Sequence, residues 1–171
     1  MTPLKAMKRI MIFGLPGSGK STFAGYLGQL LGLPVYHLDR YFFTANWQAR
    51  DYQEFLDLQQ KLVEEPAWVI DGNASKSLEV RFAQADIVIY FRFKRLLCLW
   101  RVFKRMFSAD QVQASPPGCS KKVRWQLITY LWGFEKRVQG KVEGLRQQYP
   151  GVLFYEFHSD EDALSFCAEI G

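Results

Sequence analysis

Short apolar runs alternate with amphipathic stretches along the whole chain. Two runs, residues 9–13 and Ile87–Phe91, are almost continuously apolar, which is typical of strands buried on both faces. Three further strands are predicted at 33–38, Trp68–Asp71 and 152–157, and helices are predicted at Lys20–Leu31, 51–64, 94–107 and 121–149. This alternation predicts one α/β domain over residues 1–171, in which a parallel sheet carries helices on both faces.

The longest predicted helix has a regular apolar face. Large apolar side chains recur there at steps of three or four, at Leu127, Leu131, Phe134, Val138, Val142, Leu145 and Tyr149. Ser159, followed by three acids, predicts the capped first turn of a closing helix. Ligands of such sheets bind beyond the carboxyl ends of the strands. Residues that directly follow a predicted strand are therefore the first candidates for a site.

One of these positions carries a phosphate-binding motif. Residues 14–21 read GLPGSGKS and match G-x-x-x-x-G-K-[ST], the Walker A pattern, at every fixed position. The glycines let backbone N–H groups turn toward phosphate oxygens, and the helix N-terminus adds partial positive charge. The predicted nucleotide-binding residues are Gly14, Pro16, Gly17, Ser18, Gly19, Lys20, Ser21 and Thr22. Lys20 is expected to reach the β- and γ-phosphates, and the Ser21 hydroxyl to bind Mg²⁺.

Two acids end predicted strands. Asp71 ends the third strand, where it would orient water on Mg²⁺ or help to activate an acceptor hydroxyl; a turn residue or helix cap is the alternative. Asp39 ends the second strand and would bind the acceptor hydroxyl or act as general base, although an Asp that caps the next turn fits as well. His37, in the same strand, is expected to be a buried and hydrogen-bonded histidine.

Further residues are assigned to the acceptor. Asn73, in the Asp-Gly-Asn turn, is grouped with Asp39 as substrate-binding. Arg81 is a candidate anchor for an anionic acceptor, and a surface salt bridge is the equal alternative.

The basic residues are concentrated in one region. The net charge is +5, but residues 92–124 hold nine Lys or Arg against one acid, whereas the remainder is slightly acidic. Arg101 and Arg105, one helical turn apart, lead into a polar, proline-containing segment. We therefore predict a lid over about residues 108–122, with both arginines neutralising charge on the transferred phosphoryl group. A solvated helix face or a nucleic-acid surface is the alternative.

Composition favours an ordinary globular protein of the cytoplasm. The 171 residues are 49% hydrophobic and 23% charged, and the chain has no apolar run of membrane-spanning length and no signal-peptide core. Cys98, Cys119 and Cys167 are too widely spaced for a zinc site and odd in number, so reduced thiols are expected.

The chain resembles the adenylate-kinase-related P-loop proteins called "DNA topology modulation protein". The resemblance rests on GLPGSGKST at 14–22, LPVYHLD at 33–39, WVIDGN at 68–73, RFAQADIVIYF at 81–91, LCLWRVFKR at 97–105 and PGC at 117–119. It implies a P-loop NTPase fold with five parallel strands, similar to nucleoside and shikimate kinases, with a lid, ATP and Mg²⁺. Departures from the family pattern at Ala74–Ser75 and near Glu135 affect the acceptor assignment most.

Two functions follow from these features. The first is a phosphotransferase that moves the γ-phosphoryl group of ATP to a small acceptor, such as a nucleoside monophosphate or a hydroxylated metabolite. The second is a nucleotide-dependent regulator that binds nucleic acid through the basic region, with little kinase activity. The first is favoured, since a phosphate loop with a flanking lid suffices for it. The acceptor, the choice between ATP and GTP, and the oligomeric state stay open.

Overall fold

The computed structural model describes residues 7–43, 48–107 and 125–170. Within these ranges, five strands form one sheet: β1 (Arg9–Gly14), β2 (Val35–His37), β3 (Trp68–Asp71), β4 (Ile87–Phe91) and β5 (Leu153–Phe157). Their order is β2-β3-β1-β4-β5, and every neighbouring pair is parallel. β1 therefore lies at the centre of the sheet, and its carboxyl end lies between the carboxyl ends of β3 and β4.

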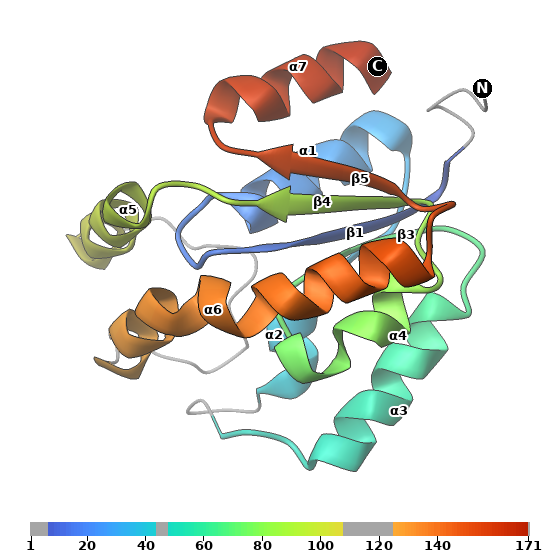
Figure 1. The fold of residues 1–171 in the computed structure, drawn as a ribbon, viewed down its shortest axis with the longest axis horizontal. Helices are drawn as coiled ribbons and strands as arrows, with labels where there is room; N and C mark the ends of the chain where they lie inside the picture. The colour runs from blue at the N-terminus through green and yellow to red at the C-terminus, as the bar shows by residue number, and fades with distance from the viewer. Residues whose placement is uncertain (1–6, 44–47, 108–124, 171) are drawn as a thin grey trace.

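Helices cover both faces of this sheet (Figure 1). α1 (Lys20–Leu31) and α7 (Asp160–Ile170) lie on one side, and α4 (Leu78–Phe82) and α6 (Trp125–Gln148) lie on the other. α3 (Tyr52–Val63) packs against α4. α5 (Arg95–Phe107) stands beyond the carboxyl end of β4, and two short elements, α2 (Leu38–Phe42) and η3 (Ser75–Ser77), follow β2 and β3. This arrangement confirms the predicted α/β architecture.

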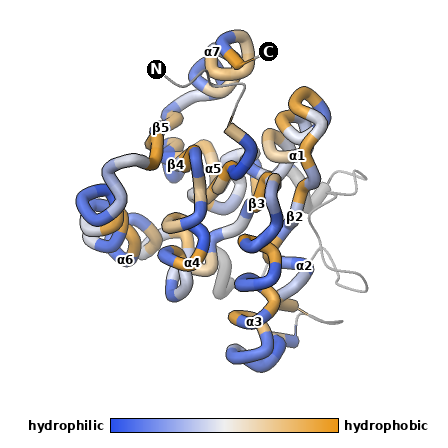
Figure 2. The backbone as a smooth tube through the Cα atoms, turned by 90° about the vertical axis from the view of Figure 1, so that its right-hand side faces the viewer, coloured by the Kyte–Doolittle hydropathy of each residue, from blue (hydrophilic) through white to orange (hydrophobic). Residues whose placement is uncertain are grey.

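The core follows the predicted apolar pattern. β3 and β4 are buried along their whole length, and β1 is buried from Ile10 onward, which explains their apolar runs. Figure 2 shows hydrophobic residues at β3 and β4. The rings of Phe13 and Tyr90 stack across β1 and β4 with centroids 4.6 Å apart. On α6, the predicted face is buried at Leu131, Phe134, Val138, Val142 and Leu145.

Side-chain caps fix where two helices begin. The Asp51 carboxylate accepts hydrogen bonds from the backbone N–H groups of Gln53 and Glu54, at 2.9 and 3.1 Å, so α3 starts at the next residue. Before α7, the Ser159 hydroxyl accepts from the N–H of Asp162, whose carboxylate accepts from the N–H of Ser159 in return. The predicted closing helix is confirmed, with its cap.

The prediction differs from the structure mainly after β2. β2 spans only three residues, and α2 begins at Leu38, so Asp39 lies in the first turn of a short helix rather than at the end of a strand. α2 and α4 were not predicted, because five residues are too few to show a helical period. Cys98 and Cys167 are buried and form no disulfide, and Cys119 lies outside the described residues. None of the described helices combines the length and the apolarity that a membrane span requires.

Candidate functional site

The predicted phosphate loop joins β1 to α1. Gly19 precedes α1 with a left-handed backbone (φ 92°), and Lys20 and Ser21 form the first turn of that helix. Ser18 is buried, and its hydroxyl oxygen has no hydrogen-bond partner among the described protein atoms. Pro16 is half-buried, and Thr22, the third residue of α1, is exposed. The loop is thus a strand-to-helix turn at the carboxyl edge of the sheet, as the motif predicts.

Glycine is required at two positions of this loop. At Gly14, φ is 146° and a Cβ would lie 2.3 Å from the carbonyl oxygen of Phe91. At Gly17, φ is 83° and a Cβ would lie 2.5 Å from the carbonyl oxygen of Cys98, in α5. Any larger residue would push the loop away from β4 or α5. These two contacts hold the loop tightly against its neighbours.

Lys20 is the basic centre of the site. Its side chain is buried, at 9% exposure, and its charge opposes the effect of burial on the pKa values of both Asp39 and Asp71, although only the pKa of Asp71 is lowered overall. A buried ammonium group without an anion nearby would be costly, so the two carboxylates account for its place here. The structure therefore brings together Lys20, Asp39 and Asp71, three of the residues that the sequence analysis assigned to the site.

Asp71 is held by two side chains. Its Oδ2 accepts a hydrogen bond of 2.5 Å from the Ser21 hydroxyl, and its Oδ1 is bonded to Nδ1 of His37. Burial raises the pKa of Asp71, but the His37 hydrogen bond and the Lys20 charge outweigh it, so the pKa lies below its usual value. Asp71 is therefore an ionised carboxylate beside the hydroxyl that begins α1.

Asp39 lies in the first turn of α2 and is exposed to solvent. The surrounding protein still desolvates its carboxyl group, which raises its pKa; the charge of Lys20 opposes this rise and the charge of Asp71 adds to it. A carboxylate with a raised pKa can accept a proton from a bound molecule more readily than an ordinary surface Asp.

Asn73 ties the phosphate loop to the turn after β3. Its Oδ1 accepts from the backbone N–H of Gly14 at 3.0 Å, and its side chain also hydrogen-bonds to the Tyr130 hydroxyl. Burial raises the pKa of Tyr130, and Asp39 adds to the rise. Tyr130 was missed by sequence analysis, since it comes from α6, far along the chain, and no spacing marks it.

Arg81 lies inside the protein. Its exposed fraction is 0%, and its two terminal nitrogens donate to the carbonyl oxygens of Gly72 and Asn73, at 2.7 and 2.9 Å. Burial lowers the pKa of Arg81 to about 10 in spite of Asp71 and Asp39, and the buried Nε has no partner among the described atoms. The guanidinium therefore braces the turn that carries Asn73, and it is not a surface salt bridge.

Arg101 reaches the phosphate loop from α5. It donates to the carbonyl oxygen of Ser18 at 3.3 Å and to both carboxylate oxygens of Asp160. The backbone of Arg105 continues α5, but its side chain, like the predicted lid at residues 108–122, lies outside the described residues. Of the two predicted arginines, the structure thus places one against the loop.

Some of the basic residues of this region pair with carboxylates from later elements. Glu135 of α6 pairs with Arg92 and Arg95, at 3.5 and 2.5 Å, and Glu156 of β5 pairs with Arg92 at 3.6 Å. The charge count along the chain could not show these pairings. They weaken the case for a nucleic-acid surface on the described part of this region.

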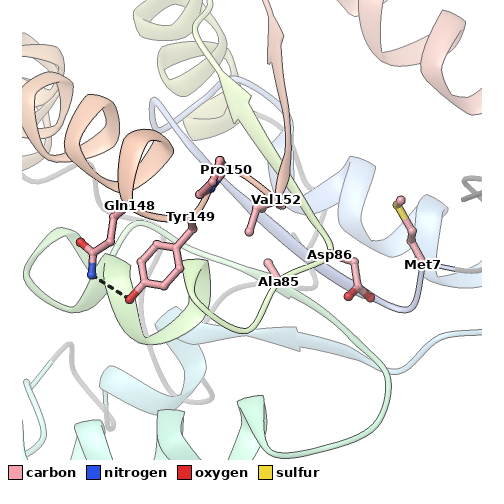
Figure 3. Close-up of a pocket in the computed structure, with 8 residues that line it drawn as sticks. Met7, Ala85, Asp86, Gln148, Tyr149, Pro150 and Val152 are labelled. Carbon is pink, nitrogen blue, oxygen red and sulfur yellow. Dashed lines mark hydrogen bonds between the residues drawn. The ribbon is translucent and has the colours of Figure 1, made fainter. Parts of the chain in front are cut away.

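One cavity of the described residues lies away from the phosphate loop. It has a volume of about 490 Å³, lies at the amino ends of β1 and β4 and is lined by Met7, Ala85, Asp86 and residues 148–152 (Figure 3). Its only charged lining group, Asp86, already accepts from the N–H groups of Lys8 and Arg9 and from the Arg9 guanidinium. This cavity is at the wrong edge of the sheet for the predicted chemistry.

The donor set at the loop suits Mg²⁺ brought by a nucleotide. Among the described residues, no group of three or more His, Cys, Asp or Glu side chains is arranged around a common point for a metal ion. Mg²⁺, however, commonly takes one or two protein oxygens and completes its shell with phosphate and water. The adjoining hydroxyl of Ser21 and carboxylate of Asp71 are hard oxygen donors of that kind.

Five parallel strands in the order β2-β3-β1-β4-β5, with a Walker A loop after the central strand, define a P-loop NTPase fold. Among solved structures, the fold is similar to shikimate kinase from Bacteroides thetaiotaomicron, with a TM-score of 0.56, 15% identity and 96% of each chain covered. It is also similar to shikimate kinase from Acinetobacter baumannii in complex with shikimate, with a TM-score of 0.54 and 20% identity over 98% of this chain and 94% of that chain.

An uncharacterized protein from Eubacterium ventriosum is also similar, with a TM-score of 0.52, 15% identity and 94% of this chain and 96% of that one covered. No family model matches the chain, and no curated protein matches it. The solved structures thus establish the shikimate-kinase-like P-loop fold, and the "DNA topology modulation protein" resemblance receives no support beyond that fold.

Proposed function

We propose that this protein is an ATP-dependent phosphotransferase that moves the γ-phosphoryl group to a small acceptor bearing a hydroxyl or monophosphate oxygen. The observation that carries the proposal is the cluster of Lys20, Ser21 and Asp71 around the start of α1, with Asp39 close enough to interact with Lys20 and Asp71. The fold similarity to shikimate kinases supports the same class of reaction.

The phosphate loop would bind the triphosphate. Backbone N–H groups around Gly17 and Gly19 and the N-terminus of α1 favour anionic oxygens, and the buried Ser18 hydroxyl would gain a partner there. Lys20 would bind the β- and γ-phosphates in addition to its electrostatic interaction with the carboxylates. Mg²⁺, when bound by Ser21 and oriented by Asp71, would neutralise charge on the phosphate oxygens.

The acceptor would bind on the Asp39 side. Asp39 would accept the proton of the attacking hydroxyl, since its pKa is raised toward the range that suits a general base. Asn73 would line this side, while Arg81 would support it from beneath through the carbonyl groups that it holds. Arg101 would stabilise charge on the transferred group from the α5 side.

The test is a screen with ATP, Mg²⁺ and pools of nucleoside monophosphates and hydroxylated metabolites, which measures ADP formation. At least one pool should stimulate ADP formation, and Lys20→Ala should abolish the stimulation and weaken binding of a non-hydrolysable ATP analogue. Lys61→Ala, on the exposed face of α3, is the matched control. Unchanged analogue binding by Lys20→Ala would contradict the phosphate-loop assignment. Salt-dependent nucleic-acid binding without any stimulating acceptor would favour the regulator instead.

A further inference from the structure

His37 stands beside Asp71 in the sheet. β2 and β3 are parallel, and His37 is directly paired with Asp71 in their register. Registered residues of parallel strands place their side chains on the same face. Nδ1 of His37 therefore meets Oδ1 of Asp71, while Oδ2 of the same carboxylate receives the Ser21 hydroxyl.

The histidine ring separates the site from a groove on the far side. Its exposed fraction is 8%, and it lines an open groove of about 590 Å³ between α1 and β2, together with Gly25, Gly28, Val35 and Arg40. α1 and β2 pack closely beside this groove, since a Cβ on Gly28 would lie 2.1 Å from a methyl group of Val35. The His37 ring thus lies between Asp71 and the groove, with its Nδ1 edge toward Asp71.

A carboxylate that is held through one oxygen can still turn about its last side-chain bond, for which the rotamer wells are broad. Asp71 has partners on both oxygens, so its plane is fixed. Because an ionised carboxylate can only accept, the proton in the contact with His37 must belong to Nδ1. Partners of this kind, which orient a ligand without touching the metal, typically affect metal affinity or activity 10–100-fold.

We propose that His37 is a positioning residue that donates its Nδ1 proton to Asp71 and thereby directs the other carboxylate oxygen toward Ser21 and the magnesium site. The inference rests on the proposed function, because it assigns a purpose to the orientation of Asp71. It gives His37 a role beyond that of a buried histidine with a satisfied hydrogen bond.

The first test is the tautomer of His37 in the unliganded wild-type protein. The chain has two histidines, so a spectrum of protein labelled with ¹⁵N-histidine contains two rings, and His158→Gln identifies the other one. The side chain of His158 is 60% exposed, with its Nε2 3.6 Å from a carboxylate oxygen of Glu156, and gives an internal reference for an exposed ring. Nδ1 of His37 should carry a proton. A proton found on Nε2 alone, or exchanging between both nitrogens as in a solvated ring, would overturn the proposal.

The second test uses variants at His37. The side-chain amide nitrogen of Asn lies where Nδ1 of His lies, so His37→Asn keeps the donor, whereas His37→Leu removes it at similar size. We expect the complex with a non-hydrolysable ATP analogue to lose Mg²⁺ affinity about 10–100-fold in His37→Leu and by less than about 3-fold in His37→Asn. Affinity for the analogue without Mg²⁺ should stay unchanged in both variants.

The outcomes separate the two proposals. If the wild-type protein does not bind the analogue, the proposed function fails. If the wild-type protein binds the analogue and His37→Leu shows the same Mg²⁺ affinity as the wild type, only the role of His37 fails. Equal losses in the Leu and Asn variants would also contradict the role, since a merely structural histidine would not be rescued by the donor of Asn.

Discussion

Both terminal nitrogens of the Arg101 guanidinium donate hydrogen bonds to the carboxylate of Asp160, and one of them also donates to the carbonyl oxygen of Ser18. The three distances are 3.2 and 2.5 Å to the carboxylate and 3.3 Å to the carbonyl oxygen. α5, the phosphate loop and the first turn of α7 are thereby connected through one side chain. The guanidinium is also 5.5 Å from the centre of the Phe93 ring, so its position is well defined before any ligand binds.

The two partners of this ion pair should respond differently to substitution. Arg101→Ala should lower turnover about 10²–10³-fold, since it removes positive charge beside the loop. Asp160→Asn should keep turnover within a few-fold and change the free energy of unfolding by less than about 1 kcal/mol, because the carboxylate is 64% exposed. Steady-state ADP formation and thermal unfolding measure both. Equal losses of turnover in the two variants would show that Arg101 acts through Asp160 rather than on the phosphates.

Asp71→Asn should separate turnover from nucleotide binding. We expect turnover to fall about 100-fold and the Mg²⁺ concentration for half-maximal rate to rise, because the ionised oxygen beside Ser21 is lost. Affinity for ATP without Mg²⁺ should change little. Asp57→Asn, on the exposed side of α3, is the control carboxylate and should behave like wild type. Near-normal turnover in Asp71→Asn would reduce Asp71 to a turn residue.

Arg81 should matter for stability first. Lys cannot reproduce the fork that donates to the carbonyl groups of Gly72 and Asn73, so Arg81→Lys should lower the free energy of unfolding by about 2–3 kcal/mol. Arg146→Lys, whose side chain is 50% exposed, should change it by less than about 1 kcal/mol. Urea denaturation gives both values. A raised KM for the acceptor with unchanged stability would instead identify Arg81 as a direct contact of the acceptor.

Asp86 should make stability depend on pH. Burial raises the pKa of Asp86, but hydrogen bonds from the backbone of Lys8 and Arg9 and from the Arg9 side chain outweigh it and lower the pKa. A carboxyl group with a lowered folded-state pKa stabilises the protein above its unfolded-state pKa and loses that effect as the pH falls through the folded-state value. Asp86→Asn should therefore cost about 1–3 kcal/mol at pH 7.

The cost of Asp86→Asn should shrink as the pH falls below about 4. Urea denaturation of both proteins between pH 7 and pH 3 measures this difference. A difference that stays constant over the whole range would show that the charge of Asp86 contributes nothing.

Local patterns predicted the centre of the sheet well. The apolar run of Ile87–Phe91 matches β4, and the Walker A motif stands between β1 and α1, because strand burial and phosphate-loop geometry depend on a few consecutive residues. Asp71 and Asp39 were also marked by their places after apolar runs. Their chemistry was predictable because parallel strands bring their carboxyl ends to one edge.

Long-range partners were beyond such patterns. The pairs of Arg92 with Glu156 and Arg101 with Asp160 join residues far apart in the chain, so a count of basic residues overstated the free positive charge. The contact of Asn73 with Tyr130 depends on how α6 lies over the sheet, which no short pattern encodes. Nothing in the sequence around Arg81 shows whether its side chain is buried and bonded to backbone carbonyl groups or exposed and free to bind an acceptor.

The phosphate loop is made early in synthesis, but its supports come much later. Asp71, the partner of Ser21, follows it by 50 residues, and Asn73, the partner of the Gly14 N–H, follows Gly14 by 59 residues. The carbonyl oxygen that packs against Gly14 belongs to Phe91, which comes later still. A nascent chain therefore contains the whole Walker A motif long before it can bind a triphosphate. Nucleotide would act only on the assembled sheet, where it stabilises the native state by mass action, and it could not rescue a chain that stops before β4.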